Sequence, residues 1–92
     1  FTGSVEELQL ILQNKQLFIG INGCSLKAQE NIEVLKHVPL GRVMIETDAP
    51  YCDIRSTHAS FKFMKTQFPE KKREKFEKKF TVKGRNEPCR VV

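Results

Sequence analysis

The sequence predicts an α/β fold in which helices alternate with short parallel strands. Two apolar runs, Leu17–Ile21 and one that begins at Val43, show no polar alternation, which is typical of strands covered on both faces. A segment with helical periodicity precedes each run. Two strands cannot form such a sheet by themselves, so the pattern also indicates that these 92 residues are part of a larger domain.

Helical periodicity places the first helix over Val5–Asn14. The spacing of Ser4 and Glu7 is that of a capping box, in which each side chain bonds the other residue's backbone N–H. Apolar residues then recur on one face, at positions 5, 8, 11 and 12. The helix is therefore expected to begin directly after Ser4.

A second helix is predicted over Leu26–His37. Ala28, Ile32 and Leu35 form its apolar stripe, and Pro39 prevents its continuation. This order of helix, strand, helix and strand implies βα units and a parallel sheet.

Downstream of the second strand, residues 53–84 are predicted to be a loop with a basic helical insertion. One helical face is expected within Phe61–Phe68 and a further helix over Glu70–Phe80. From residue 61 to the end there are eleven Lys or Arg and four Glu, so this segment carries 11 − 4 = +7, and the remaining residues sum to −2. Such a segment favours a polyanionic partner such as nucleic acid; the alternative is a solvated helix face.

The three cysteines, Cys24, Cys52 and Cys89, are odd in number and include no C-x-x-C motif. This usage is typical of a reduced intracellular protein with free thiols. A zinc site made from the three thiols and His58 is the alternative, although the spacing matches no standard zinc motif. No run of about 18 apolar residues is present, so no membrane-spanning segment is predicted.

Alternation along the second strand divides its side chains into two sets. Met44, Glu46 and Asp48 project to one side, and Val43 and Ile45 to the other. If the apolar pair meets a helix layer, Asp48 points into a barrel at the carboxyl end of a strand, where barrel active sites lie. A carboxylate there suits a divalent cation or a general base, the alternative being a turn cap. Glu46 lies one layer deeper and is expected to be structural, with a basic partner.

Three short motifs stand out: Phe1-Thr-Gly3, Ile45-Glu-Thr-Asp-Ala-Pro50 and Arg85-Asn-Glu-Pro88. In order and spacing they resemble the TatD deoxyribonucleases, which are amidohydrolase-type metal-dependent hydrolases. The first motif resembles the end of that family's His-x-Phe-Thr-Gly segment, and the other two resemble its C-terminal signatures. Ser56-Thr-His58 looks most like the eukaryotic branch. The resemblance covers essentially the whole chain.

The resemblance implies the C-terminal portion of a (β/α)8 barrel, a TIM barrel, with roughly its last two strands. It implies one or two divalent metal ions in the barrel mouth, without distinguishing Mg²⁺, Mn²⁺ or Zn²⁺. Asp48 would be a metal ligand and the base for the attacking water. The parent protein would be a nuclease that hydrolyses DNA phosphodiester bonds with metal-activated water. DNA is the implied partner, with no membrane and no small-molecule cofactor.

The family's remaining ligands, a His-x-His pair, a bridging Glu and two later His, do not occur in this chain. The isolated 92 residues are therefore expected to be inactive. Two alternatives to an enzyme are a basic module that binds nucleic acid without catalysis and an inactive truncated product. An intracellular location is expected, and the resemblance favours the nucleus, with which Lys71-Lys-Arg73 is compatible.

The start of the first helix is a candidate substrate contact. Gly3 and Ser4 bring free N–H groups to a helix N-terminus, which favours phosphate. The alternative is plain capping.

Further candidates lie in the loop region after Asp48. Arg85 would neutralise a phosphate or pair with Glu46 or Glu87, and Asn86 would orient a metal ligand. A substrate contact by His58 is the alternative to an ordinary hydrogen-bonded loop histidine.

Overall fold

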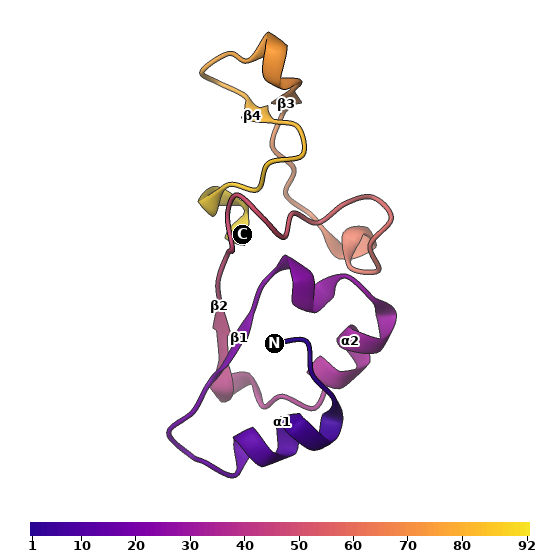
Figure 1. Cartoon of the computed structure of the whole chain (residues 1–92), viewed down its shortest axis with the longest axis vertical. Coiled ribbons are helices and arrows are strands. Elements are labelled where there is room, and N and C mark those ends of the chain that lie inside the picture. Colours follow the sequence, from indigo (N-terminus) through magenta and orange to yellow (C-terminus); the bar gives the residue numbers. More distant parts are fainter.

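The computed structural model describes all residues from 1 to 92. The molecule is elongated, with principal extents of 48 × 25 × 19 Å, and consists of a body at one end and a projecting arm at the other (Figure 1). The body holds α1 (Val5–Leu12), β1 (Ile19–Ile21), α2 (Gln29–Leu35) and β2 (Val43–Ile45). The arm holds β3 (Glu70–Lys71) and β4 (Thr81–Val82). None of the helices could span a membrane.

Helix α1 begins where the sequence predicts. Ser4 Oγ accepts from the Glu7 backbone N–H, and the Glu7 carboxylate accepts from the Ser4 backbone N–H, so the capping box is confirmed. The helix ends at Leu12, two residues before the predicted end. Leu8 is fully buried and anchors the helix to the body.

Arg42 holds the end of α1 against the strands. Its guanidinium donates to the carbonyls of Leu12 at 3.3 Å, Asn14 at 2.7 Å and Leu17 at 2.7 Å. A helix C-terminus leaves carbonyls without partners and favours a cation. The residue that precedes β2 therefore closes the turn that leads into β1.

The two strands of the body pair in parallel, as predicted. The register joins Ile19 to Val43 and Ile21 to Ile45, and the Glu46 backbone N–H extends the ladder by donating to the Ile21 carbonyl at 3.0 Å. Parallel pairing brings the carboxyl ends of both strands to the same edge of the sheet. Residues 22 and 46 consequently emerge next to each other.

The strand β2 departs from the prediction that both its faces are covered. Met44 is 58% and Ile45 69% exposed, so neither face of this strand is sealed within the 92 residues. The buried apolar side chains are Leu8, Ile19 and Val82, which make a thin core.

The second helix is shorter than predicted at both ends and stops at Leu35. A 3-10 turn occupies Gly23–Leu26, and α2 begins only at Gln29. The reason is the Asn22 side chain, whose Oδ1 accepts from the backbone N–H groups of Cys24 and Ser25 and so starts a tight turn directly after β1.

The prediction that the basic segment is helical is wrong. Phe61–Phe63 and Arg73–Lys75 form single 3-10 turns, and the ends of the arm pair as β3 and β4 in parallel register. An eleven-residue helix with little core to pack on is marginal in water. Instead, Lys71 pairs with Glu77 at 2.8 Å and lies 4.4 Å from the centre of the Phe80 ring.

Candidate functional site

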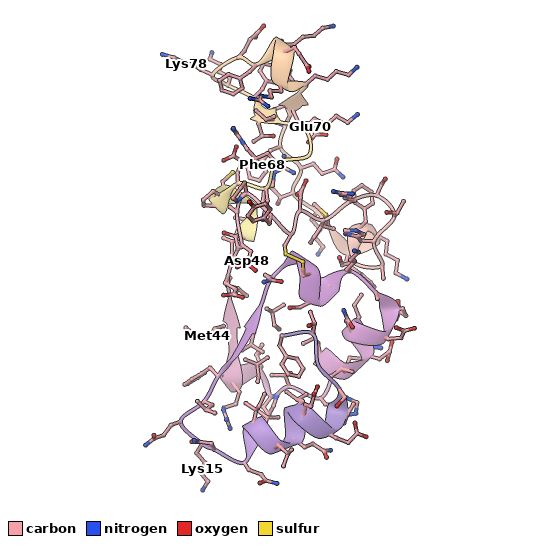
Figure 2. All side chains as sticks on the ribbon, in the orientation of Figure 1. Lys15, Met44, Asp48, Phe68, Glu70 and Lys78 are labelled. Atoms are coloured by element: carbon pink, nitrogen blue, oxygen red, sulfur yellow. A yellow bond between two sulfur atoms is a disulfide. The ribbon has the colours of Figure 1, made fainter.

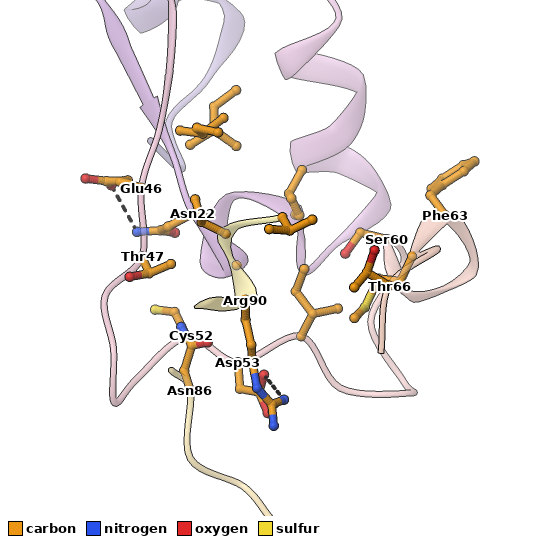
Figure 3. A pocket seen from close by; sticks show the side chains of 18 of the residues that line it. Asn22, Glu46, Thr47, Cys52, Asp53, Ser60, Phe63, Thr66, Asn86 and Arg90 are labelled. Carbon is orange, nitrogen blue, oxygen red and sulfur yellow. Dashed lines mark hydrogen bonds and ion pairs between the residues drawn. The ribbon is translucent and has the colours of Figure 1, made fainter. Parts of the chain in front are cut away.

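The amide of Asn22 joins the ends of the two body strands. Its Nδ2 donates to Asp48 Oδ2 at 2.8 Å and to Glu46 Oε1 at 3.3 Å (Figure 3 shows the bond to Glu46). Its Oδ1 accepts from the N–H of Cys24 at 2.9 Å. Asn22 is 9% exposed, so this amide is held in one orientation while both carboxylates reach it from the side.

The two carboxylates share a face, as strand alternation predicts. Glu46 and Asp48 contact the same amide, which is possible only if both project from the same side of the extended chain. The basic partner expected for Glu46 would come from elsewhere in the barrel, so that expectation stays a prediction. Glu46 is exposed, and its partner is the neutral amide of Asn22.

The loop after Asp48 is fastened by a residue from the end of the chain. Asn86 Nδ2 donates to the Tyr51 carbonyl at 2.8 Å, and the Asn86 backbone N–H donates to the Pro50 carbonyl at 3.0 Å. The Tyr51 N–H in turn donates to the Asp48 carbonyl at 2.7 Å. Asn86 is 6% exposed, and it therefore orients the backbone that carries Asp48 without touching the carboxylate.

A disulfide joins Cys24 to Cys52, so the prediction of three free thiols is wrong for this pair. The bond links the turn after β1 to the loop after β2, which parallel pairing brings together. Sequence spacing could not reveal this proximity. Cys52 Sγ lies 4.0 Å from Asp48 Oδ2, but a disulfide sulfur has no hydrogen to donate.

The alternative of a zinc site built from three thiols and His58 is also excluded. Cys24 and Cys52 are consumed by the disulfide, while Cys89 is exposed and free. His58 Nδ1 accepts from the Arg55 backbone N–H at 3.1 Å and so closes a local turn.

The other predicted site residues make no hydrogen bond or ion pair with the Asp48 carboxylate. Ser4 caps α1, and Gly3 lies against the Glu7 carboxylate, where a side chain would collide with it. Arg85 pairs with Glu87, its Nε donating to Oε1 at 2.8 Å, and does not reach Glu46.

The side-chain oxygens at Asp48 and Glu46 are of the kind that binds a divalent cation, but they are too few to hold one. Asp48 Oδ1 and Glu46 Oε2 have no hydrogen-bond partner in the chain, and carboxylate oxygens are the ligands that hard cations prefer. However, no group of three or more His, Cys, Asp or Glu side chains comes together anywhere in the chain. A bound ion would need further ligands from outside these residues.

A cavity of about 550 Å³ opens beside the site (Figure 3). Ile21, Leu26 and Ile32 contribute to its apolar wall. Ser60 Oγ and Arg90 Nε are buried in its lining without hydrogen-bond partners. The polar side chains that line it include Asn22, Glu46, Asp53, Ser60, Asn86 and Arg90.

Sequence reasoning missed Asn22 as the residue that joins the site. The available signal was its position: an Asn directly after one buried strand, at the edge where the next strand ends in Asp48. By residue type, Asn22-Gly-Cys-Ser25 indicates only a turn.

The chain is similar over residues 1–92 to the family model described as TatD related DNase. It is 45% identical over 91 residues to "Deoxyribonuclease Tat-D" from Schizosaccharomyces pombe, covering 97% of this chain and 29% of the relative. It is 47% identical over 92 residues to "Putative deoxyribonuclease TATDN1 homolog" from Encephalitozoon cuniculi, covering 100% of this chain and 30% of the relative.

Two solved structures are similar throughout. One is an uncharacterized amidohydrolase from Saccharomyces cerevisiae, with a TM-score of 0.89 and 42% identity. The other is a hydrolase TatD family protein from Entamoeba histolytica, with a TM-score of 0.91 and 42% identity. Each match covers 99% of this chain and 30% of the solved chain. The chain thus spans about 30% of the length of the relatives it matches.

Proposed function

Because the chain belongs to the family of TatD-related DNases, we propose that it is part of a metal-dependent deoxyribonuclease that hydrolyses DNA phosphodiester bonds. The observation that carries the proposal is the position of Asp48. Its carboxylate stands just beyond the end of β2, oriented by the buried amide of Asn22. In barrel enzymes this is the end at which active sites form.

The parallel β1–α2–β2 unit supports a place for these residues within a (β/α)8 barrel. One helix connects the two strands, and both faces of β2 remain open to further elements. We propose that residues 1–92 form the C-terminal portion of that barrel, with residues 53–84 as an insertion after its last strand.

Asp48 would hold one divalent ion through its carboxylate, with Glu46 close enough to add a second negative charge. When bound, such an ion makes a water molecule more acidic and neutralises charge on the phosphoryl oxygen. The Asp48 carboxylate would take the proton of the attacking water, since Oδ1 has no competing donor in the chain. Asn22 would keep Oδ2 in place during this transfer.

The 92 residues alone supply too few ligands to retain an ion, and we propose that they do not cleave DNA by themselves. The full-length protein is the unit in which Asp48 would act. We propose an intracellular, nuclear location, which the basic run Lys71–Arg73 supports.

The test is DNA cleavage by the full-length protein with Mg²⁺ or Mn²⁺. EDTA should abolish cleavage, and Asp48→Asn should lower the rate by about 10²–10⁴-fold, which is typical of losing a general base. Lys15→Gln, at the far end of the body, is the matched control and should cleave normally. Cleavage that persists in EDTA, or in Asp48→Asn at the control rate, would overturn the proposal.

A further inference from the structure

Residues 69–83 form a projection that we call the basic arm. It extends along the long axis of the molecule, so that Lys78 lies at the opposite end from Lys15 (Figures 1 and 2). The arm contains seven Lys or Arg and three Glu, which gives 7 − 3 = +4. A short segment with almost no core of its own therefore carries most of the chain's excess positive charge.

Most of this charge is not neutralised within the molecule. Lys71 alone is paired, with Glu77 at 2.8 Å. The other six basic side chains are exposed and have no carboxylate within 4.0 Å: Lys72, Arg73, Lys75, Lys78, Lys79 and Lys83. Cations placed close together repel one another, and a polyanion relieves that repulsion by replacing their counterions.

The base of the arm is fastened to the site. Arg90 donates through Nη1 to Asp53 Oδ1 at 3.0 Å, five residues beyond Asp48 (Figure 3). Through Nη2 it donates to Thr81 Oγ1 at 2.8 Å and to Glu70 Oε2 at 3.3 Å. The Arg90 side chain is only 15% exposed. One largely buried guanidinium therefore joins the first residues of β3 and β4 to the loop that leaves Asp48, which ties the base of the arm to the site.

The ion pairs of the arm leave its outer part positively charged. Glu70 is engaged by Arg90 and Glu77 by Lys71, so Glu74 is the arm's one acidic side chain without an ion pair. At the tip, Phe76 is 51% exposed between Lys75 and Glu77. Unpaired cations with an exposed aromatic ring match a nucleic-acid backbone and a base that can stack.

We propose that the basic arm binds the phosphate backbone of the DNA that flanks the bond to be cut. The inference rests on the proposed function for its ligand, and it adds a binding site separate from Asp48. Contacts to phosphate carry no sequence information, so the arm would raise affinity and set the direction of the DNA without selecting a sequence. Arg90 is the residue that would keep the arm in line with Asp48.

The experiment measures binding by the full-length protein of a fluorescein-labelled DNA duplex in EDTA, so that no cleavage occurs, from about 50 to 200 mM salt. The arm variant is Lys78→Gln/Lys79→Gln, and the control is Lys15→Gln, an exposed lysine without an ion pair at the other end of the molecule (Figure 2). Each lost phosphate contact lowers the salt slope of log K by about 0.9, so the arm variant should lose about 1.8. The control should keep the wild-type slope.

An unchanged slope in the arm variant, or an equal fall in the control, would overturn the arm proposal. Loss of binding to anionic lipid vesicles with unchanged DNA binding would also overturn it, because the arm would then serve a membrane surface. The two proposals fail separately. Salt-sensitive binding through the arm without metal-dependent cleavage refutes the nuclease, whereas metal-dependent cleavage with an unaltered slope refutes the arm.

Discussion

Asn22 and Asp48 stand 26 residues apart in the chain and are joined by a 2.8 Å hydrogen bond from the amide Nδ2 to the carboxylate Oδ2. The bond exists because β1 and β2 pair in parallel and end at the same edge. Asn22 also caps the following turn through its other amide atom, Oδ1. One buried side chain thus serves both the fold and the carboxylate.

Asn22→Asp separates these two roles. The substituted carboxylate can still accept from the N–H groups of Cys24 and Ser25, but it places a third negative charge against Glu46 and Asp48. Cleavage by the full-length protein should fall by about 10–100-fold, the usual effect of losing the group that orients a metal ligand. Titration with Mn²⁺ should show a changed metal dependence, while circular dichroism stays at the wild-type signal. Wild-type kinetics would show that the amide has no part in positioning Asp48.

Asn86→Ala should destabilise the loop that carries Asp48. The Tyr51 carbonyl loses its donor in a part-buried hydrogen bond, which costs about 0.5–1.5 kcal/mol in the free energy of unfolding. Urea unfolding measures this change. Lys83→Gln, at a nearby exposed position without an ion pair, is the control and should stay within about 0.5 kcal/mol of wild type. If both variants unfold at the same midpoint, Asn86 does not fasten the loop.

Arg42→Met tests the link between α1 and the strands. Three carbonyls lose a charged donor while the apolar stem is largely kept, so the free energy of unfolding should fall by about 1–3 kcal/mol. Hydrogen exchange should localise the loss to the last turn of α1. Arg55→Met is the matched control, because the Arg55 side chain makes no hydrogen bond or ion pair. Equal exchange in the two variants would contradict the role of Arg42.

The stability of α2 is expected to depend weakly on pH through Glu33. Hydrogen bonds from Lys36 and then from Gln29 hold the pKa of Glu33 below its usual value of 4.5. A lowered folded-state pKa means that the folded protein binds fewer protons than the unfolded one, so the stabilisation is present above pH 4.5 and is lost as the pH falls through the lower value. NMR titration of the Glu33 carboxyl carbon should give a midpoint below 4.5, and Lys36→Gln should raise it. A midpoint of 4.5 in both the wild type and the variant would show that Lys36 does not lower the pKa of Glu33.

Local signals predicted the body of the fold well. The capping box at Ser4 and the two apolar runs depend on neighbours in sequence, and alternation alone placed Glu46 and Asp48 on one face. The arm was predicted as helix because Lys and Glu are good helix formers. In the structure the arm is not helical, and it makes contacts that periodicity cannot show, such as the ion pair of Lys71 with Glu77.

Residues that connect distant segments were not predictable from the sequence. By residue type alone, Asn22 looks like a turn residue and Arg90 like a surface residue. Their partners, Asp48 and Asp53, are distant in sequence and come close only in the folded chain. The same holds for Cys24 and Cys52, whose proximity depends on the parallel register. In each case the sequence does not show which distant segments the fold brings together.

The disulfide can also report whether the protein's compartment is oxidising or reducing. A protease that nicks the backbone anywhere between Cys24 and Cys52 leaves two pieces that remain joined through sulfur, and they separate only after reduction. Protein recovered from cells with its thiols blocked, then nicked and run on gels with and without reductant, would therefore travel as one band or two. The band pattern records whether the place where the protein works is oxidising or reducing.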